Sequence, residues 1–242
     1  MEHILEVRKL NVYYKSASKS IFGKASKKQV LFDINFDVNE GEIFGIVGES
    51  GCGKSTLSKA VLGMNTLYDG EIIHHSVKPQ MIFQDPYSSL NPAWTVGRIL
   101  REPLILSGVK DKNELTGMVN DMLLRVGLDE TYARRRPSQL SGGQRQRISI
   151  AAALIAGPRL IIADEPLSAL DVTIQAQIMK LLLELKNELG LTYIFISHDI
   201  DVVYQMCDRI MVMKDGHVIE SGETEELFSD PKEAYTRQLI EG

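Results

Sequence analysis

The sequence lacks the features that define several large classes of protein. The apolar run nearest to the roughly 18 to 20 residues of a membrane-spanning helix, 151–163, is interrupted by Gly157, Pro158 and Arg159. Two cysteines in 242 residues provide no disulfide framework. The first residues show neither the basic start nor the apolar core of a secretion signal. We therefore expect a cytoplasmic protein that contacts a membrane only through partners.

The chain also has no excess of basic residues. Lys and Arg number 27 against 32 Asp and Glu, which gives a formal net charge of −5. Proteins that bind nucleic acid generally present a basic face that displaces counterions from phosphates, so we expect no nucleic-acid partner. A hydrophobic content of 44% is enough for a substantial core in one large domain or two subdomains.

Short apolar segments alternate along the chain with segments of helical periodicity. This is the pattern of a largely parallel sheet flanked by helices. The expected strands are 4–14, 30–38, 43–47, 160–164 and 192–197, and Asp215-Gly216 is expected to turn a terminal hairpin.

From about residue 95 to residue 156 the strand patterns stop and helical patterns replace them, with Asp111 or Asn113 as a candidate cap. We therefore predict a helical subdomain, 84–156, inserted into an α/β core that consists of 1–83 and 157–242. A further amphipathic helix is predicted at 172–189.

The segment 48–56 matches the pattern G-x-x-x-x-G-K-[ST]. In this pattern backbone N–H groups close on phosphate oxygens, the lysine neutralises phosphate charge and the next hydroxyl reaches Mg²⁺. The alternative is a glycine-rich turn that happens to contain Lys-Ser. A buried strand at 43–47 and a helix at 56–64 argue against it, because they place a helix N-terminus at the phosphates. The predicted nucleotide ligands are Ser50, Gly51, Cys52, Gly53, Lys54, Ser55 and Thr56.

An acidic pair, Asp164-Glu165, follows the predicted strand 160–164, and strand ends are where α/β sheets place ligand chemistry. Asp164 is suited to hold Mg²⁺, and Glu165 to orient or deprotonate an attacking water. By itself such a pair more often marks the start of a helix or a turn. The phosphate loop upstream and the motif at 140–144 favour the catalytic interpretation.

The segment 140–144, Leu-Ser-Gly-Gly-Gln, resembles the signature of the ATP-binding-cassette (ABC) family, which caps a triphosphate held by another subunit. Together with the loop (Walker A) and the acidic pair (Walker B), the resemblance covers nearly the whole chain. It implies a P-loop NTPase fold of the RecA-like kind, with a mostly parallel sheet core, an N-terminal antiparallel β region and the inserted helical subdomain. It further implies a dimeric ATPase that uses ATP and Mg²⁺ and contacts nucleotide through Ser141, Gly142, Gly143 and Gln144.

The same resemblance gives roles to three polar residues. Gln84 looks like the glutamine of the Q-loop, which would join Ser55 and Asp164 at Mg²⁺. Asp171 looks like the D-loop aspartate near the nucleotide. A histidine after a strand is usually only a polar residue at a strand end, but His198 looks like the switch histidine that hydrogen-bonds the γ-phosphate.

Tyr14 looks like the family's aromatic residue that stacks on adenine. Tyr13 precedes it, and neighbouring residues of a strand face opposite ways. One of the two tyrosines is therefore expected to face the adenine, and the resemblance favours Tyr14.

Within the family, the segments 83–92 and 227–236 look most like the ATPases of dipeptide, oligopeptide and nickel importers. Two features depart from that group: the usual cysteine-bearing C-terminal extension is absent, and 70–80 is short for the antiparallel β region. We expect an ATPase that energises import of peptides, nickel or another metal chelate through separate membrane subunits.

The resemblance implies a second copy or a related ATPase subunit as dimer partner, two transmembrane permease subunits and an extracytoplasmic substrate-binding protein. It places the chain at the cytoplasmic face of the cell membrane. One alternative is a non-transport ABC ATPase in DNA repair, chromosome structure or translation, which generally has a long coiled coil or tandem cassettes. Another is an inactive regulatory module, against which Glu165 and His198 count.

Two further segments have simple interpretations. His74-His75 lacks the Cys or carboxylate partners of a metal site and is expected in a polar strand or loop. The segment 15–29 holds five lysines and no acid, which suits a solvated loop or a contact with lipid headgroups or a partner.

Overall fold

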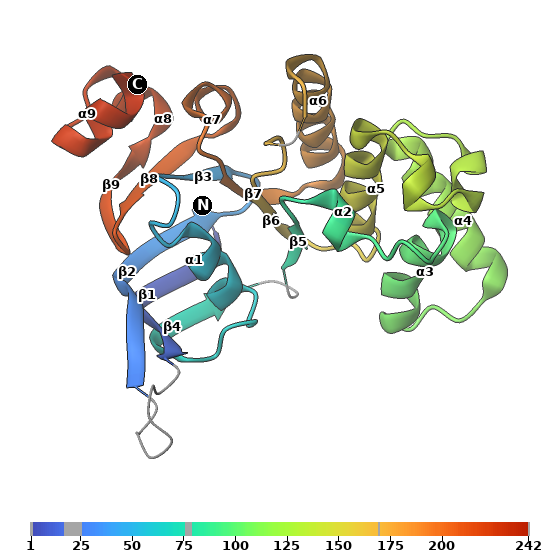
Figure 1. Ribbon diagram of the computed structural model, residues 1–242, viewed down its shortest axis with the longest axis horizontal. Helices are drawn as coiled ribbons and strands as arrows, with labels where there is room; N and C mark the ends of the chain where they lie inside the picture. The colour runs from blue at the N-terminus through green and yellow to red at the C-terminus, as the bar shows by residue number, and fades with distance from the viewer. Residues whose placement is uncertain (1, 17–25, 76–78, 169, 242) are drawn as a thin grey trace. The chain divides into compact units, whose positions relative to one another are not determined.

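The computed structural model describes residues 2–16, 26–75, 79–168 and 170–241. The chain packs as two compact units, Met1–Lys78 with Thr192–Gly242, and Pro79–Leu191 (Figure 1). The predicted division at 84 and 156 has other bounds than these units, and it stays a prediction.

The first unit begins with a three-stranded antiparallel sheet in the order β2-β1-β4. Its strands are β1 (His3–Ser16), β2 (Ser26–Asn39) and β4 (Tyr68–His74). This confirms the N-terminal antiparallel region. The pairing of β1 with β2 continues to Ser16 opposite Ser26, so the two ends of the lysine-rich segment are strand rather than loop. Residues 17–25 of that segment lie outside the described residues.

The first unit also contains a group of parallel strands. In it β3 (Ile43–Val47) lies between β7 (Thr192–Ile196) and β8 (Arg209–Lys214), parallel to both. Every residue of β3 and β7 is buried, as expected for the central strands of a parallel sheet. Asp215-Gly216 turns β8 into the antiparallel β9 (His217–Glu223), which confirms the hairpin.

The described residues of this unit form four helices, of which the sequence predicts only the first. They are α1 (Lys54–Val61), α7 (Ile200–Met206), α8 (Thr224–Ser229) and α9 (Ala234–Glu241). The last three are short, so their periodicity gave little signal.

The second unit combines two parallel strands with helices. Its strands are β5 (Gln80–Ile82) and β6 (Leu160–Asp164). The green-to-yellow helices of Figure 1 confirm that this region is helical. The last helix of the unit confirms the helix predicted at 172–189. The helices are α2 (Pro86–Ser89), α3 (Val96–Leu106), α4 (Lys112–Arg125), the 3₁₀ turns η1 (Glu130–Arg134) and η2 (Pro137–Gln139), α5 (Gly142–Leu154) and α6 (Val172–Leu189).

Helix starts in this unit follow the chemistry of N-caps, in which a side-chain oxygen accepts an otherwise unpaired backbone N–H. Thr95 accepts the N–H of Arg98, and Asp111, not Asn113, caps α4. No helix among the described residues is long and apolar enough to cross a membrane.

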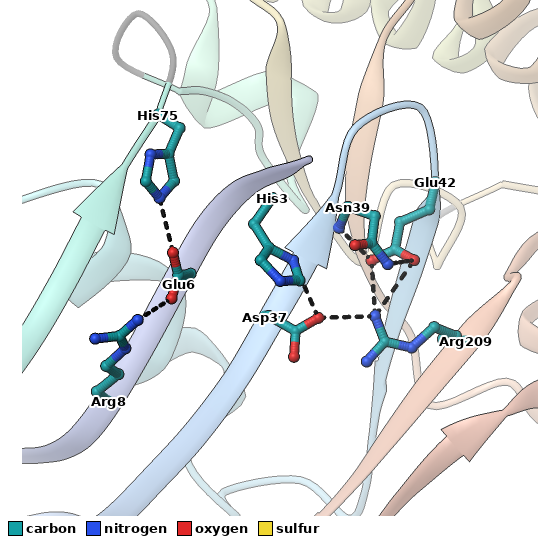
Figure 2. A network of polar contacts seen from close by, with 8 residues as sticks. All are labelled: His3, Glu6, Arg8, Asp37, Asn39, Glu42, His75 and Arg209. Carbon is teal, nitrogen blue, oxygen red and sulfur yellow. Dashed lines mark hydrogen bonds and ion pairs between the residues drawn. The ribbon is translucent and has the colours of Figure 1, made fainter. Parts of the chain in front are cut away.

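Arg209 of β8 ties the two sheets of the first unit together (Figure 2). Its Nη1 lies 3.1 Å from Asp37 Oδ2 on β2 and 3.2 Å from Glu42 Oε1. Glu42 Oε1 also accepts the backbone N–H of Asn39 at 2.7 Å. Burial acts to lower the pKa of Arg209, but Glu42 and Asp37 outweigh it and raise that pKa above its usual value. The cluster is therefore a partly buried, charge-assisted network.

The neighbouring residues His74 and His75 lie at the end of β4. His75 Nε2 lies 2.9 Å from Glu6 Oε1 (Figure 2), and His74 ends β4. Hydrogen bonds from His75 and Arg8 hold the pKa of the Glu6 carboxyl below its ordinary value. The described residues contain no group of three His, Cys, Asp or Glu able to hold a metal ion.

The Arg209 network generates a prediction about stability. Arg209→Met keeps much of the side-chain volume but leaves the Glu42 carboxylate without its cation, so the free energy of unfolding should fall by about 2–3 kcal/mol. Urea denaturation followed by circular dichroism measures the change. Arg125→Met is the matched control, because Arg125 pairs with Glu188 at an exposed site, where an ion pair contributes about 0–1 kcal/mol. Equal losses in both variants would show that Arg209 is an ordinary surface cation.

Candidate functional site

The phosphate-binding loop connects β3 to α1 with a conformation that depends on glycine. Gly51 and Gly53 have φ of +85° and +117°, which is the left-handed region where a Cβ is strained. A Cβ on Gly48 would lie 2.1 Å from the carbonyl oxygen of Met213, so only glycine fits there. Gly53 precedes α1 without a side-chain cap, so the helix start leaves its N–H groups for a ligand.

Lys54 folds back over this loop. The side chain is only 6% exposed, and its ammonium donates to the carbonyl oxygens of Gly48 at 2.6 Å and Glu49 at 3.0 Å. The cation is thus held against the backbone at the start of the phosphate loop. An anion in the loop would meet both the donors and the charge.

The loop is braced by the C-terminal part of the chain. The N–H of Gly216, in the β8–β9 turn, donates to the carbonyl of Cys52 at 2.8 Å. The N–H of Glu49 donates to the hydroxyl of Tyr235 on α9 at 3.2 Å. The hairpin and the 227–236 motif can be predicted from the sequence, but neither contact can, because a contact between distant segments leaves no local pattern.

The first unit brings Tyr14 close to this loop. The Tyr14 hydroxyl is 3.5 Å from Thr56 Oγ1, and its side chain is 39% exposed. Tyr13 is half-buried, and Lys27 Nζ lies 5.7 Å from its ring centre. Tyr14 is therefore the tyrosine beside the phosphate loop.

His198 follows β7 and is exposed. Ile46 of β3 pairs with Ile196 of the parallel β7, so the loop and His198 leave the same edge of the strand group. This is the edge at which parallel α/β sheets bind ligands. α7 then starts with Asp199 as its cap.

In the second unit the structure joins two predicted residues directly. Gln84 Nε2 donates to Glu165 Oε2 at 2.8 Å. The contact follows from the parallel pairing of β5 and β6, with Ile82 opposite Ala163, because both side chains come just after these strands. Asp164 ends β6 and is buried.

Glu165 has a backbone conformation that is rare for its residue type. Its φ is +47°, which costs a non-glycine residue about 1–3 kcal/mol. The N–H and the hydroxyl of Ser168 both donate to the Glu165 carbonyl, at 3.3 and 3.2 Å. The turn is therefore held in a strained form in which the Glu165 carboxylate reaches Gln84.

The signature segment forms the start of α5. Ser141 Oγ accepts the N–H of Gln144 at 3.3 Å, and Gln144 Oε1 accepts the N–H of Ser141 at 3.0 Å. This reciprocal capping box occupies the two side chains that we predicted at the nucleotide. A Cβ on Gly143 would lie 2.9 Å from Ile174 Cγ2, so the glycine allows close packing of α6. Asp171 caps α6 by accepting the N–H of Ile174 at 3.0 Å.

The predicted site residues thus form two groups, one in each compact unit. The loop, Tyr14 and His198 belong to the first; Gln84, Asp164, Glu165, Asp171 and the signature belong to the second. The contacts of these residues with a nucleotide stay predictions.

Known proteins match nearly the whole chain. Residues 31–168 match the family described as ABC transporter. The chain is 41% identical to the oligopeptide transport ATP-binding protein OppF of Bacillus subtilis, over 99% of this chain and 82% of that protein. It is also 41% identical to the dipeptide transport ATP-binding protein DppF of Haemophilus influenzae, over 96% and 75%.

Solved structures give the same result. CbiO1 of Clostridium perfringens, part of the ABC transporter complex CbiONQ, matches with a TM-score of 0.80 and 32% identity, over 95% of this chain and 92% of that one. The ATP-binding cassette MJ0796, in a dimeric post-hydrolysis state bound to ADP and Pi, matches with a TM-score of 0.77 and 30% identity, over 91% and 98%.

Proposed function

The chain belongs to the ABC transporter family, and we propose that it is the ATP-hydrolysing subunit of an importer for peptides. The observation that carries the ATPase is the phosphate loop with the ammonium of Lys54 held 2.6 Å from the Gly48 carbonyl. The peptide cargo is supported by similarity to OppF and DppF over nearly the whole chain. Nickel or another metal chelate is the cargo that the sequence motifs leave open beside it.

ATP binding follows from the first unit. Backbone N–H groups of residues 50–56 surround the phosphates, and Lys54 exchanges its two carbonyl partners for phosphate oxygens. The ring of Tyr14 stacks on the adenine, since this side chain lies exposed beside Thr56.

In the proposed mechanism, hydrolysis depends on Glu165 and Gln84 and on His198. The Glu165 carboxylate accepts a proton from the attacking water or orients it, and its bond with Gln84 fixes one carboxylate oxygen so that the other faces the water. His198 hydrogen-bonds the γ-phosphate and loses this partner when the phosphate leaves.

The residues predicted at Mg²⁺ are Ser55, Gln84 and Asp164. Their donor atoms are a hydroxyl, an amide and a carboxylate oxygen, and Asp164 is buried at the strand end. Such oxygen donors suit Mg²⁺. Bound Mg²⁺ would supply charge neutralisation at the phosphates.

The signature acts on a nucleotide held by a second subunit. The capping box orients the first N–H groups of α5, and the exposed Gly142 leaves the helix start open to a phosphate. Two subunits then close head to tail over two ATP molecules, with Asp171 near the junction. The second subunit is another copy or a related ATPase.

The importer consists of two such subunits, two permease subunits and an extracytoplasmic substrate-binding protein, with this chain at the cytoplasmic face of the membrane. Residues 84–156 act as a helical subdomain that passes motion to the permeases, and 1–83 with 157–242 act as the nucleotide-binding core. Copurification with membrane subunits tests the importer. Copurification with nucleic acid or ribosomes instead would favour a non-transport ABC ATPase.

Glu165→Gln tests the catalytic group. Binding of ATP should persist, because the phosphate loop is untouched, while turnover should fall by roughly 10²- to 10⁴-fold. The variant should also accumulate as an ATP-bound dimer, which size-exclusion chromatography detects. Near wild-type phosphate release would remove Glu165 from this role. Lys54→Ala is the contrasting variant, since it should lose ATP affinity itself.

Tyr14→Ala tests the adenine contact. Stacking on an aromatic ring contributes about 1–3 kcal/mol, so ATP affinity should fall several-fold or more, and Tyr14→Trp should retain it. Tyr13→Ala is the matched control on the same strand. If Tyr13→Ala weakens ATP binding and Tyr14→Ala does not, the assignment of the two tyrosines is reversed.

Gln84→Ala tests coupling to transport. The isolated subunit should keep most of its ATP affinity, because the phosphate loop and Lys54 are untouched. In the assembled complex, stimulation of hydrolysis by cargo-loaded binding protein should be lost, since we propose that Gln84 relays the motion of the helical subdomain to the hydrolysis reaction. Equal stimulation of mutant and wild-type complexes in one membrane preparation would contradict the coupling role.

A further inference from the structure

The C-terminal helix α9 reaches the phosphate loop through one side chain. The hydroxyl of Tyr235 accepts the backbone N–H of Glu49 at 3.2 Å, across 186 residues of sequence. The ring of Tyr235 lies below the ammonium of Lys214, with Nζ 4.3 Å from its centre. A cation above the ring face favours one position of the tyrosine.

This hydrogen bond acts on a particular peptide unit. A peptide bond is planar, so the carbonyl of Gly48 and the N–H of Glu49 move together as one rigid group. The carbonyl accepts the ammonium of Lys54 at 2.6 Å, and the N–H donates to Tyr235. Tyr235 and Lys54 therefore hold the two ends of the same rigid group.

The peptide unit needs such a restraint because of the residue before it. Gly48 has a φ of +146° and no Cβ, and glycine limits backbone rotation less than any other residue. If the unit rotated, the Gly48 carbonyl would turn away from Lys54. Fixing the Glu49 N–H from outside the loop prevents this rotation.

Tyr235 is mounted on a rigid support. The Glu220 carboxylate on β9 accepts the N–H of Lys232 at 2.9 Å and that of Glu233 at 3.1 Å, just before α9 begins. Thr236, the next residue after Tyr235, is fully buried. These contacts fix the start of α9 to the sheet, so Tyr235 is held by the folded unit.

We propose that Tyr235 is a positioning residue for ATP binding: it fixes the Gly48–Glu49 peptide unit so that the loop carries Lys54 in place before the nucleotide arrives. The inference rests on the proposed binding of ATP by the loop. Preorganisation of this kind raises the affinity for ATP, because a loop that is already ordered loses no conformational freedom when the ligand binds. Tyr235 does not touch the groups that activate water, so the rate of the bound complex does not depend on it.

Tyr235→Phe in the full-length chain separates these effects, since it removes the hydroxyl and keeps the ring above which Lys214 lies. The expected result is a Kd for a fluorescent ATP analogue, and a KM for ATP, about three- to tenfold higher, as for the loss of one hydrogen bond. The kcat should stay within about twofold, and the thermal unfolding temperature should fall by no more than about 2–4 °C, as for the loss of one hydrogen bond in a chain of this size.

Tyr204→Phe is the matched control, because the Tyr204 hydroxyl donates to the Glu225 carboxylate at 3.1 Å, in the same unit and away from the loop. It should leave both Kd and KM unchanged. Unchanged affinity in Tyr235→Phe, or an equal loss in Tyr204→Phe, overturns the role of Tyr235. Absence of ATP binding by the wild-type chain would instead overturn the proposed function.

Discussion

The buried ammonium of Lys54 is the constraint on which the site depends. Among the residues that the structure describes, its oxygen partners are the carbonyls of Gly48 and Glu49, and no carboxylate lies within ion-pair distance. A charge removed from water and balanced by dipoles alone is costly, so the loop favours a polyanion that supplies the missing charge. Until the polyanion binds, the carbonyls of Gly48 and Glu49 must hold the Lys54 ammonium in place. This requirement explains a glycine at 48, where a Cβ has no room, and the outside support from Gly216 and Tyr235.

The sequence was sufficient for the parts of the fold that leave a local pattern. The apolar runs at β3, β6 and β7, the 172–189 helix and the Asp215-Gly216 turn were all predicted and are confirmed. The extension of β1 and β2 depends on cross-strand pairing, so their ends were missed. The bracing of the loop by Gly216 and Tyr235 joins segments more than 150 residues apart in sequence, and no periodicity records it.

The motifs indicate the kind of reaction, but they do not predict which contacts each side chain makes within the folded chain. Ser141, Gln144 and Asp171 were chosen for a nucleotide, and here they start helices. The two roles are compatible, because a capped helix presents its remaining N–H groups in fixed directions. Glu165 differs from these helix-capping residues, because its backbone conformation is unfavourable for its residue type. Its left-handed φ works against local preference, which sequence propensity cannot foresee. Ser168 holds this strained turn, in which the carboxylate reaches Gln84.

The two units contribute opposite charges. The first offers backbone donors and the Lys54 cation, while the second offers the carboxylates of Asp164 and Glu165 with the Gln84 amide. Neither set alone suits ATP complexed with Mg²⁺: the donors match the phosphates, and the carboxylates match a metal ion and a water molecule. In the proposed function the two sets therefore act on different parts of ATP complexed with Mg²⁺. Because hydrolysis removes the γ-phosphate, the donors and the Lys54 cation hold the product less tightly than ATP, which is the property that a cyclic motor requires.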